Sequence, residues 1–206
     1  MNVVIAVLSH YPDLFERFRS DVERYEPDVP KILVRDEELI ECRLYPDYYP
    51  GVSWTVVDGE QPFSFPRNMN LAWHVAGKSD VVIAGDDVQF TGPFVGKLQE
   101  VAYSDPTIGF CVPETGGQSA FVCAYIKRKL LDEVGEMDEA FDCYGFCDND
   151  FYRRFEAKGW RTQPTNEVSI IHQGATSFYR KAAAGGESVQ DSCDRGQKIY
   201  EEKWAK

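Results

Sequence analysis

Hydrophobic residues in the first part of the chain fall either into continuous runs or into helical spacing. Residues 2–9 and 31–34 are apolar runs rich in β-branched side chains, which is typical of strands buried on both faces of a sheet. Between them, Pro12 opens a segment whose apolar positions keep a 3.6-residue period, as in an amphipathic helix. A strand, a helix and a second strand in succession predict a right-handed parallel crossover. The apolar positions of this helix are Leu14, Phe15, Phe18, Val22 and Tyr25.

The alternation of strands and helices continues and predicts an α/β fold with a mostly parallel central sheet. Residues 42–50 and 114–118 are expected to be loops, and Gly185-Gly186 marks a tail segment expected to be mobile. Further strands are expected over residues 52–57, 81–84, 108–112, 121–126 and 168–172, and further helices over 66–76, 93–103, 129–134, from about 150 to 158, and in the tail up to Trp204.

The segment 79–88 concentrates the candidate chemistry. Its apolar run, residues 81–84, leads through Gly85 into the adjacent carboxylates Asp86 and Asp87, and we expect Gly85 to let the backbone turn without a Cβ penalty. The carboxylates are then expected at the carboxyl edge of the sheet, where open α/β proteins bind ligands. Adjacent carboxylates repel each other unless a positive charge lies nearby, and their hard oxygens suit Mg²⁺ or Mn²⁺. A solvated turn or a helix cap is the alternative.

Composition narrows the class of protein. With 206 residues the chain is long enough for one α/β domain and too short for two. Its net charge of −12 argues against extended binding to nucleic acid, while it permits a small anion that arrives with a divalent metal. No apolar stretch is long enough to span a bilayer, the N-terminus does not resemble a signal peptide, and the six cysteines are expected to be free thiols. These features predict a cytoplasmic protein.

Several short motifs flank the Asp-Asp strand. Arg67-Asn68 precedes it at an expected helix start, and residues 128–141 follow the pattern Arg-x-x-Leu-x-x-x-Gly-x-x-Asp-x-x-Phe. Asp148-Asn-Asp150 then leads into a helix, and His172-Gln-Gly begins at the end of the last expected strand. The order and spacing of these motifs, over nearly the whole chain, resemble those of the inverting GT-A glycosyltransferases of family 2.

The resemblance implies a fold and an activity. The expected fold is a GT-A (Rossmann-like), three-layer α/β/α fold with a mostly parallel mixed central sheet. It would form a single domain over residues 1–206, with about 1–90 as the nucleotide-sugar-binding half and about 91–206 as the acceptor and catalytic half. The implied reaction is the metal-dependent transfer of a sugar, with inversion, from a nucleotide sugar to an acceptor hydroxyl. The donor would most often be a UDP sugar, and the cofactor Mn²⁺ or Mg²⁺.

The resemblance also implies residue roles. Asp148 would be the general base that deprotonates the acceptor hydroxyl, and Asp87 and His172 would hold the metal. A satisfied core histidine remains the alternative for His172, and a helix N-cap remains the alternative for Asp148 or Asp150. The implied donor-binding residues are Ser9, Asp36, Arg67, Asp86, Asp87 and Arg180, and Asp150, Gly116 and Gly117 would support the site.

Three donor-binding assignments have structural alternatives as well. Asp36 follows the second strand, where the family holds the nucleotide base, and an ordinary surface turn would also place an Asp there. Arg67 could meet the diphosphate or the ribose, or pair with Asp86. Arg180 and Lys181 could close over the phosphates as a lid, or be solvated like most charged residues of a tail.

The sequence departs from the family pattern at two positions. Gly85 stands where the family motif has its first acidic residue, and Cys147 replaces the acidic residue usual before Asp148. Cys147 favours the alternative of a non-catalytic nucleotide- or carbohydrate-binding module.

Two other classes of protein share single features with this chain. Gly85-Asp86-Asp87 is also found in the palms of viral RNA polymerases, but the chain is too short and too acidic for that class. A sugar nucleotidyltransferase would need a Gly-rich phosphate loop with a Lys near the N-terminus, which is absent from the sequence. The acceptor is left open among a soluble glycan, a protein side chain and a hydroxylated nucleobase, the last being a hydroxymethylated DNA base if the protein is phage-encoded.

Overall fold

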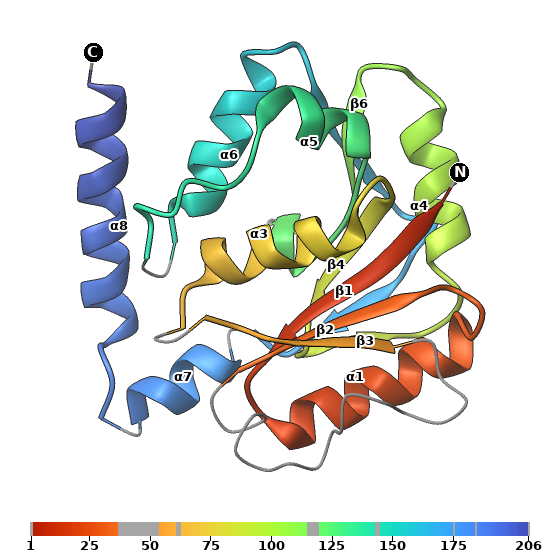
Figure 1. Cartoon of the computed structure of the whole chain (residues 1–206), viewed down its shortest axis with the longest axis horizontal. Coiled ribbons are helices and arrows are strands. Elements are labelled where there is room, and N and C mark those ends of the chain that lie inside the picture. The colour runs from red at the N-terminus through yellow and green to blue at the C-terminus, as the bar shows by residue number, and fades with distance from the viewer. Residues whose placement is uncertain are drawn as a thin grey trace.

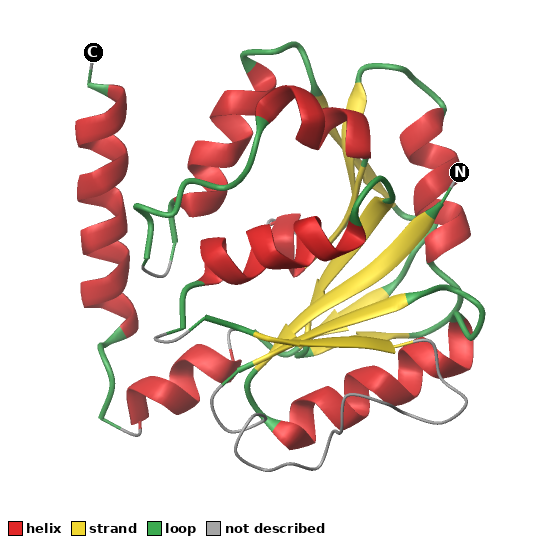
Figure 2. Cartoon of the chain, viewed as in Figure 1, coloured by secondary structure: helices red, strands yellow, loops and turns green. Residues whose placement is uncertain are grey.

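The structure is a computed structural model that describes residues 2–36, 54–60, 63–114, 120–142, 145–174, 176–183 and 185–205. Its strands form a seven-stranded sheet in the order β3-β2-β1-β4-β7-β6-β8 and a separate two-stranded sheet of β5 and β9 (Figures 1 and 2). The strands are β1 Val3–Ser9, β2 Lys31–Arg35, β3 Trp54–Asp58, β4 Asp80–Gly85, β5 Val88–Phe90, β6 Ile108–Pro113, β7 Cys123–Ile126, β8 Arg161–Thr165 and β9 Ile170–His172.

Helices cover both faces of the larger sheet and make three layers (Figure 1). The helices α1 and α4 lie on one face, and α3, α5 and α6 lie on the other, while α8 stands at the side of the molecule. The helices are α1 Pro12–Tyr25, α3 Phe65–Ala76, α4 Val95–Tyr103, α5 Arg128–Val134, α6 Cys147–Glu156, α7 Thr176–Ala183 and α8 Val189–Trp204, with a short 3₁₀ helix η1 at Ala120–Val122.

The sheet is mixed and mostly parallel, as the sequence predicts. β3, β2, β1 and β4 run parallel to one another, β7 runs antiparallel to β4 and β6, and β8 is again parallel to β6. The carboxyl ends of β1, β2 and β4 therefore meet at one edge. Leu8 pairs with Gly85 across the β1–β4 ladder, so the residues that follow these two positions come out of the sheet side by side.

Alternate residues of the central strands belong to two separate hydrophobic cores, one on each face of the sheet. On β1, Ala6 packs with α3, α5 and α6, whereas Ile5 and Val7 pack with α1 and α4. The helical period of α1 is borne out, because Phe15, Phe18 and other predicted positions are buried in the second core. Burial on both faces explains why β1, β2 and β4 are continuous apolar runs and do not alternate.

Three parts of the chain differ from the sequence-based expectation. The first residues of the predicted strand 121–126 form the 3₁₀ helix η1, and β7 begins only at Cys123. β8 has the polar sequence Arg-Thr-Gln-Pro-Thr and is an edge strand, where one face and one side meet water, so it lacks an apolar run. A helix, α7, occupies part of the segment expected to be an irregular tail.

The described cysteines are free thiols, as predicted. Cys111, Cys123 and Cys147 are buried, and burial raises the pKa of the Cys111 thiol to about 12. Cys42, Cys143 and the predicted loop 42–50 lie outside the described residues. Within the described part of the chain, no helix combines the length and the apolar character that crossing a bilayer requires.

Candidate active site

Asp86 and Asp87 lie where β4 leaves the sheet, as the sequence predicts. Both are buried, at 5% and 7% exposed. The parallel register of β1 and β4 places Ser9 beside Asp86, and the Ser9 hydroxyl donates a hydrogen bond of 2.6 Å to Asp86 Oδ2. A solvated turn is therefore the wrong interpretation of this pair.

Gly85 has a different role from the one predicted. It is the last residue of β4, and its φ is not in the left-handed region, so the backbone there does not require glycine. The requirement is space, because a Cβ at this position would lie 2.7 Å from Asp87 Oδ1. The side chain of Asp87 folds back over the strand end, into the volume that a side chain at position 85 would fill.

The two-stranded sheet brings His172 to Asp87. β5 and β9 are antiparallel with His172 opposite Val88, and the backbone N–H of Gln173 donates to the carbonyl oxygen of Asp87 at 3.2 Å. His172 Nε2 consequently lies 3.4 Å from Asp87 Oδ2. The His172 side chain faces a cavity, so it is not an enclosed core histidine.

Asp148 enters the same region from the first turn of α6. The N-cap of this helix is Phe146, at φ 65°, which is the one non-glycine residue with positive φ in the described part of the chain. Asp148 Oδ1 accepts a hydrogen bond of 2.9 Å from the N–H of Asn149. Neither Asp148 nor Asp150 is the N-cap, and Asp148 lines the cavity.

These residues surround one cavity of about 530 Å³ at the carboxyl edge of the sheet. Its walls are largely apolar, yet five carboxylates reach it, and among its described lining residues none is Lys or Arg. The carboxylates are those of Asp86, Asp87, Asp142, Asp148 and Glu187. The described lining thus presents more carboxylates than cationic side chains, which favours an anionic ligand that arrives with a bound cation.

Three predicted donor-binding residues do not line the cavity. Asp36 is buried behind it, with Oδ2 3.8 Å from Nδ1 of His10, which does line it. Arg67 lies in the first turn of α3 with Nε 3.6 Å from Glu60. Arg180 forms a two-pronged ion pair with Asp13, at 2.7 and 2.8 Å.

The Arg180–Asp13 pair is also visible in the pKa values of its members. The Arg180 guanidinium lowers the pKa of the Asp13 carboxyl, and the pKa of Arg180 is raised chiefly by Asp13, with a smaller contribution from Asp86. Arg180 thus lies within the electrostatic reach of the candidate site, although its side chain is directed to α1.

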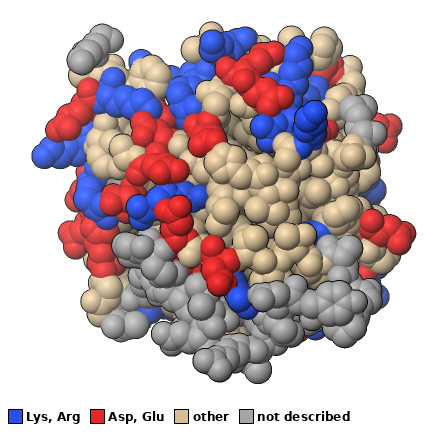
Figure 3. Space-filling model, in the orientation of Figure 1, with Lys and Arg blue, Asp and Glu red and all other residues tan. Residues whose placement is uncertain are grey.

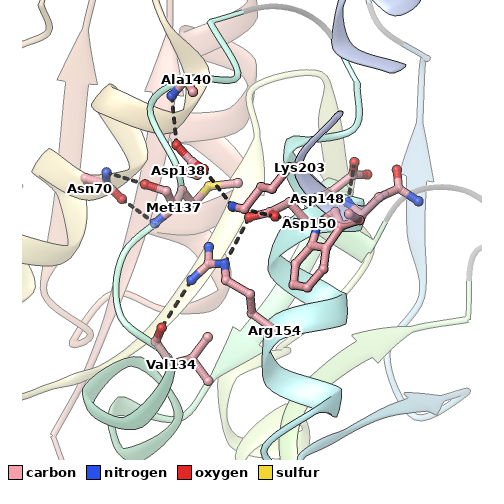
Figure 4. Close-up of polar contacts among 11 residues, drawn as sticks. Asn70, Val134, Met137, Asp138, Ala140, Asp148, Asp150, Arg154 and Lys203 are labelled. Atoms are coloured by element: carbon pink, nitrogen blue, oxygen red, sulfur yellow. Dashed lines mark hydrogen bonds and ion pairs between the residues drawn. The ribbon is translucent and has the colours of Figure 1, made fainter. Parts of the chain in front are cut away.

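Asp150 is fully buried and is bound by side chains of the C-terminal helix (Figure 4), and it does not line the cavity. Its Oδ2 accepts from Arg154 Nε at 2.9 Å. Its Oδ1 accepts from the indole N–H of Trp204 at 3.0 Å and lies 2.7 Å from Lys203 Nζ. Asp150 therefore joins α6 to α8. The predicted supporting residues Gly116 and Gly117 lie outside the described residues.

Sequence reasoning missed several residues of the cavity wall. His10 follows β1, and Asp142 and Glu187 come from loops in the second half of the chain. Four phenylalanines also line the cavity: Phe63, Phe65, Phe121 and Phe146. None of these belongs to a motif, and only the position of His10 directly after a strand end could have indicated it.

Asp87 and His172 are the residues best placed to bind a metal ion. A carboxylate oxygen and an imidazole nitrogen together suit Mn²⁺ and other divalent ions. Among the described residues, no three His, Cys, Asp or Glu side chains gather closely enough to hold a metal ion by themselves. Asp148 shares the cavity, but within the part of the chain that the structure describes it does not complete such a cluster.

No protein-family model matches the sequence, and no curated protein matches it. Solved structures do. The mannosyltransferase PcManGT from Pyrobaculum calidifontis, in complex with GDP-Man and Mn²⁺, is 15% identical with a TM-score of 0.68 over 97% of this chain and 69% of its own. GalNAc-T7 with UDP, GalNAc and Mn²⁺ is 12% identical, with a TM-score of 0.69 over 84% of this chain and 44% of its own.

A nucleotidyltransferase-type structure is similar as well. A Bacillus anthracis protein described as a glucose-1-phosphate thymidylyltransferase is 10% identical, with a TM-score of 0.58 over 92% of this chain and 96% of its own. At these identities the comparisons establish the fold: the chain has the GT-A fold of glycosyltransferases. Since the same framework also carries nucleotidyl transfer, the reaction has to be argued from the site.

Proposed function

We propose that this protein is a metal-dependent glycosyltransferase that moves a sugar from a nucleotide sugar to an acceptor hydroxyl. The donor we expect is a UDP sugar. The observation that carries the proposal is the single cavity in which Asp86 and Asp87, His172 and Asp148 meet, although they come from distant parts of the sequence. The complexes of the similar structures with GDP-Man or UDP and Mn²⁺ support it.

The charge of the cavity supports the need for a metal. A nucleotide sugar brings a diphosphate, and the described walls offer it five carboxylates and no Lys or Arg. Asp87 and His172 would hold Mn²⁺ or Mg²⁺, because they combine suitable ligand atoms 3.4 Å apart. When bound, the ion would offset the negative charge that develops on the leaving diphosphate.

The other donor contacts follow from the sheet edge. Ser9 and Asp86, joined by a hydrogen bond, would receive the ribose, and Asp36 would act on the nucleotide base through His10. Arg67 and Arg180 would reach the donor only by changing partners. For Arg180 this means leaving Asp13 and turning toward the phosphates, as a lid residue would. In this arrangement about residues 1–90 supply most of the donor contacts, and about residues 91–206 supply the acceptor side and the base, together with His172 and Arg180 for the donor.

Asp148 would act as the general base. The acceptor oxygen attacks the anomeric carbon, its bond to that carbon forms while the bond from the carbon to the diphosphate oxygen breaks, and its proton passes to the Asp148 carboxylate. A base on the face opposite the leaving group gives inversion. Asp150, which joins α6 to α8, would support Asp148 by fixing the helix that carries it.

The test begins with the donor. A thermal-shift screen of UDP and GDP sugars, with and without Mn²⁺, should find a donor that raises the melting temperature only with the metal. Slow hydrolysis of that donor should then fall about 10²- to 10⁴-fold in Asp148→Asn, while the thermal shift stays. Asp28→Asn, an exposed change in the turn before β2, is the matched control and should hydrolyse the donor like the wild type.

The same experiment distinguishes the second candidate function. A non-catalytic nucleotide- or carbohydrate-binding module is favoured by Cys147, which lines the cavity in place of a carboxylate. Such a module would show the thermal shift without any donor hydrolysis. Hydrolysis that is equal in the wild type and Asp148→Asn would reject Asp148 as the base, and the lack of any metal-dependent shift would reject nucleotide-sugar binding altogether.

A further inference from the structure

The wall of the cavity beyond Asp148 carries a group of fixed charges, Asp142, Glu187 and Arg195, that the proposed reaction does not use. Arg195 of α8 lies between the two carboxylates. Its Nη1 is 2.5 Å from Asp142 Oδ1, and its Nη2 is 2.7 Å from Glu187 Oε2. Both carboxylates line the cavity, whereas Arg195 does not. The two acids therefore belong to the cavity lining, and the guanidinium that pairs with both of them lies outside that lining.

Glu187 is held as a carboxylate. The hydrogen bond from Arg195 lowers the pKa of Glu187, burial opposes this, and a hydrogen bond from Ser192 adds to the lowering. Ser192 is itself buried and lines the cavity. Because Asp142 and Glu187 share one arginine with Asp148 nearby, this wall presents three carboxylates to a ligand and keeps a negative charge even after the ion pairs are counted.

The neighbouring surface is apolar. Phe146, directly before α6, lines the cavity and packs against Tyr200 of α8, with ring centroids 5.8 Å apart. Phe65 and Phe121, which also line the cavity, pack edge to face with their ring centroids 6.0 Å apart. Aromatic rings beside carboxylates form a surface that can pack against the apolar face of a ring while accepting hydrogen bonds from its hydroxyl groups.

We infer that Asp142 and Glu187 make the acceptor side of the cavity selective for an uncharged saccharide and against phosphorylated or otherwise anionic acceptors. This inference rests on the proposed function, because it assigns the wall around Asp148 to the acceptor. Hydroxyl groups of a neutral sugar can donate to Asp142 and Glu187, whereas a phosphate would face three carboxylates at short range. Like charges brought together in this way disfavour the wrong ligand more strongly than they help the right one.

The surface around α8 agrees with this assignment. In Figure 3, Lys and Arg residues on the side of α8 are interspersed with Asp and Glu and form no continuous basic surface on the face shown. An anionic polymer such as DNA gains little from such a surface, since its affinity depends on releasing counterions to a basic one. The face shown therefore offers no support for a hydroxymethylated DNA base as acceptor.

The test uses matched acceptors with the donor identified by the thermal-shift screen. The probes are the p-nitrophenyl glycosides of glucose, galactose, mannose and N-acetylglucosamine, and the 6-phosphate of each. For the best neutral glycoside, kcat/KM should exceed that of its 6-phosphate at least about 10-fold, and added salt should reduce this ratio. In Glu187→Gln and in Asp142→Asn the ratio should fall several-fold, mainly through the KM of the phosphorylated acceptor.

Glu100→Gln is the matched control, because it removes the same charge from an exposed position on α4, outside the cavity, and should leave the ratio unchanged. A wild-type preference for the 6-phosphates would overturn the inference, and so would equal ratios in Glu187→Gln and Glu100→Gln. Donor hydrolysis that no glycoside stimulates, or that only a hydroxymethylcytosine oligonucleotide stimulates, would also overturn it. Failure of the proposed function looks different, because the donor would then either not bind or bind without being hydrolysed, before any acceptor is added.

Discussion

The two ends of β4 each bury aspartate, and they use it in opposite ways. At the amino end, Asp80 Oδ2 accepts hydrogen bonds from the hydroxyls of Tyr103 and Tyr125, at 2.7 and 2.6 Å. Its Oδ1 accepts one from the backbone N–H of Arg128 at 2.8 Å. At the carboxyl end, Asp86 and Asp87 are buried to the same degree but line a cavity.

The difference teaches that burial alone does not mark a functional carboxylate. Asp80 ties β4 to α4, β7 and α5 through donors that belong to the protein, so its contribution is to stability. Asp86 and Asp87 face open volume in which a ligand or an ion can complete their surroundings. The carboxyl end of a parallel sheet offers this volume, because the strands end there in loops that diverge.

The largest expected effect separates the two ends by activity. Asp87→Asn should lower metal-dependent donor hydrolysis by about 100-fold or more, because a neutral amide is a poor ligand for a divalent ion. Asp80→Asn should leave the hydrolysis rate per folded molecule unchanged. Initial rates measured against Mn²⁺ concentration test both variants. An Asp87→Asn protein with the Mn²⁺ dependence of the wild type would show that Asp87 does not bind the metal.

The next effect separates the two ends by stability. Asp80→Asn should lower the free energy of unfolding by about 2 kcal/mol, since an amide cannot replace a charged acceptor for two hydroxyls and a backbone N–H. Asp87→Asn should change it by less than about 0.5 kcal/mol. Urea unfolding followed by circular dichroism gives both values. If the two variants lose equal stability, the carboxyl end has a structural role as well.

The smallest expected effect concerns the hydrogen bond from the Tyr103 hydroxyl to Asp80. Burial, followed by the hydrogen bond to Asp80, raises the pKa of Tyr103 above its ordinary value of about 10. The Tyr103 hydroxyl therefore ionises at a lower pH in the unfolded chain than in the folded protein. Its contribution to stability is fully present below about pH 10 and is lost as the pH rises toward the pKa of the folded state. Tyr103→Phe should reduce this fall by about 0.5 kcal/mol per pH unit, allowing for solvent screening at a side chain 40% exposed.

Unfolding free energies of the wild type and Tyr103→Phe between pH 9 and 11 measure this difference. Identical slopes for the two proteins would show that Tyr103 keeps its ordinary ionisation in the folded state, and that its hydrogen bond to Asp80 is weak.

The candidate site was predictable where a residue ends a strand or comes directly after one. Ser9 and His172 end β1 and β9, Asp86 and Asp87 come after β4, and the structure brings all four to one cavity. The position of Arg180 was not predictable, because its partner Asp13 is far away in sequence and lies on a helix of the other half. The 3₁₀ turn at η1 and the polar edge strand β8 were missed because neither carries a periodic apolar signal.

The sequence alone determined the layered α/β fold, because runs of buried β-branched residues and a 3.6-residue period are local consequences of burial. It also determined the chemistry available at the sheet edge. Only the tertiary structure decided that Gly85 leaves space for the Asp87 side chain and that Asp150 binds side chains of α8. It also decided that Asp142 and Glu187 reach the cavity. These facts depend on contacts between residues distant along the chain, which no local pattern records.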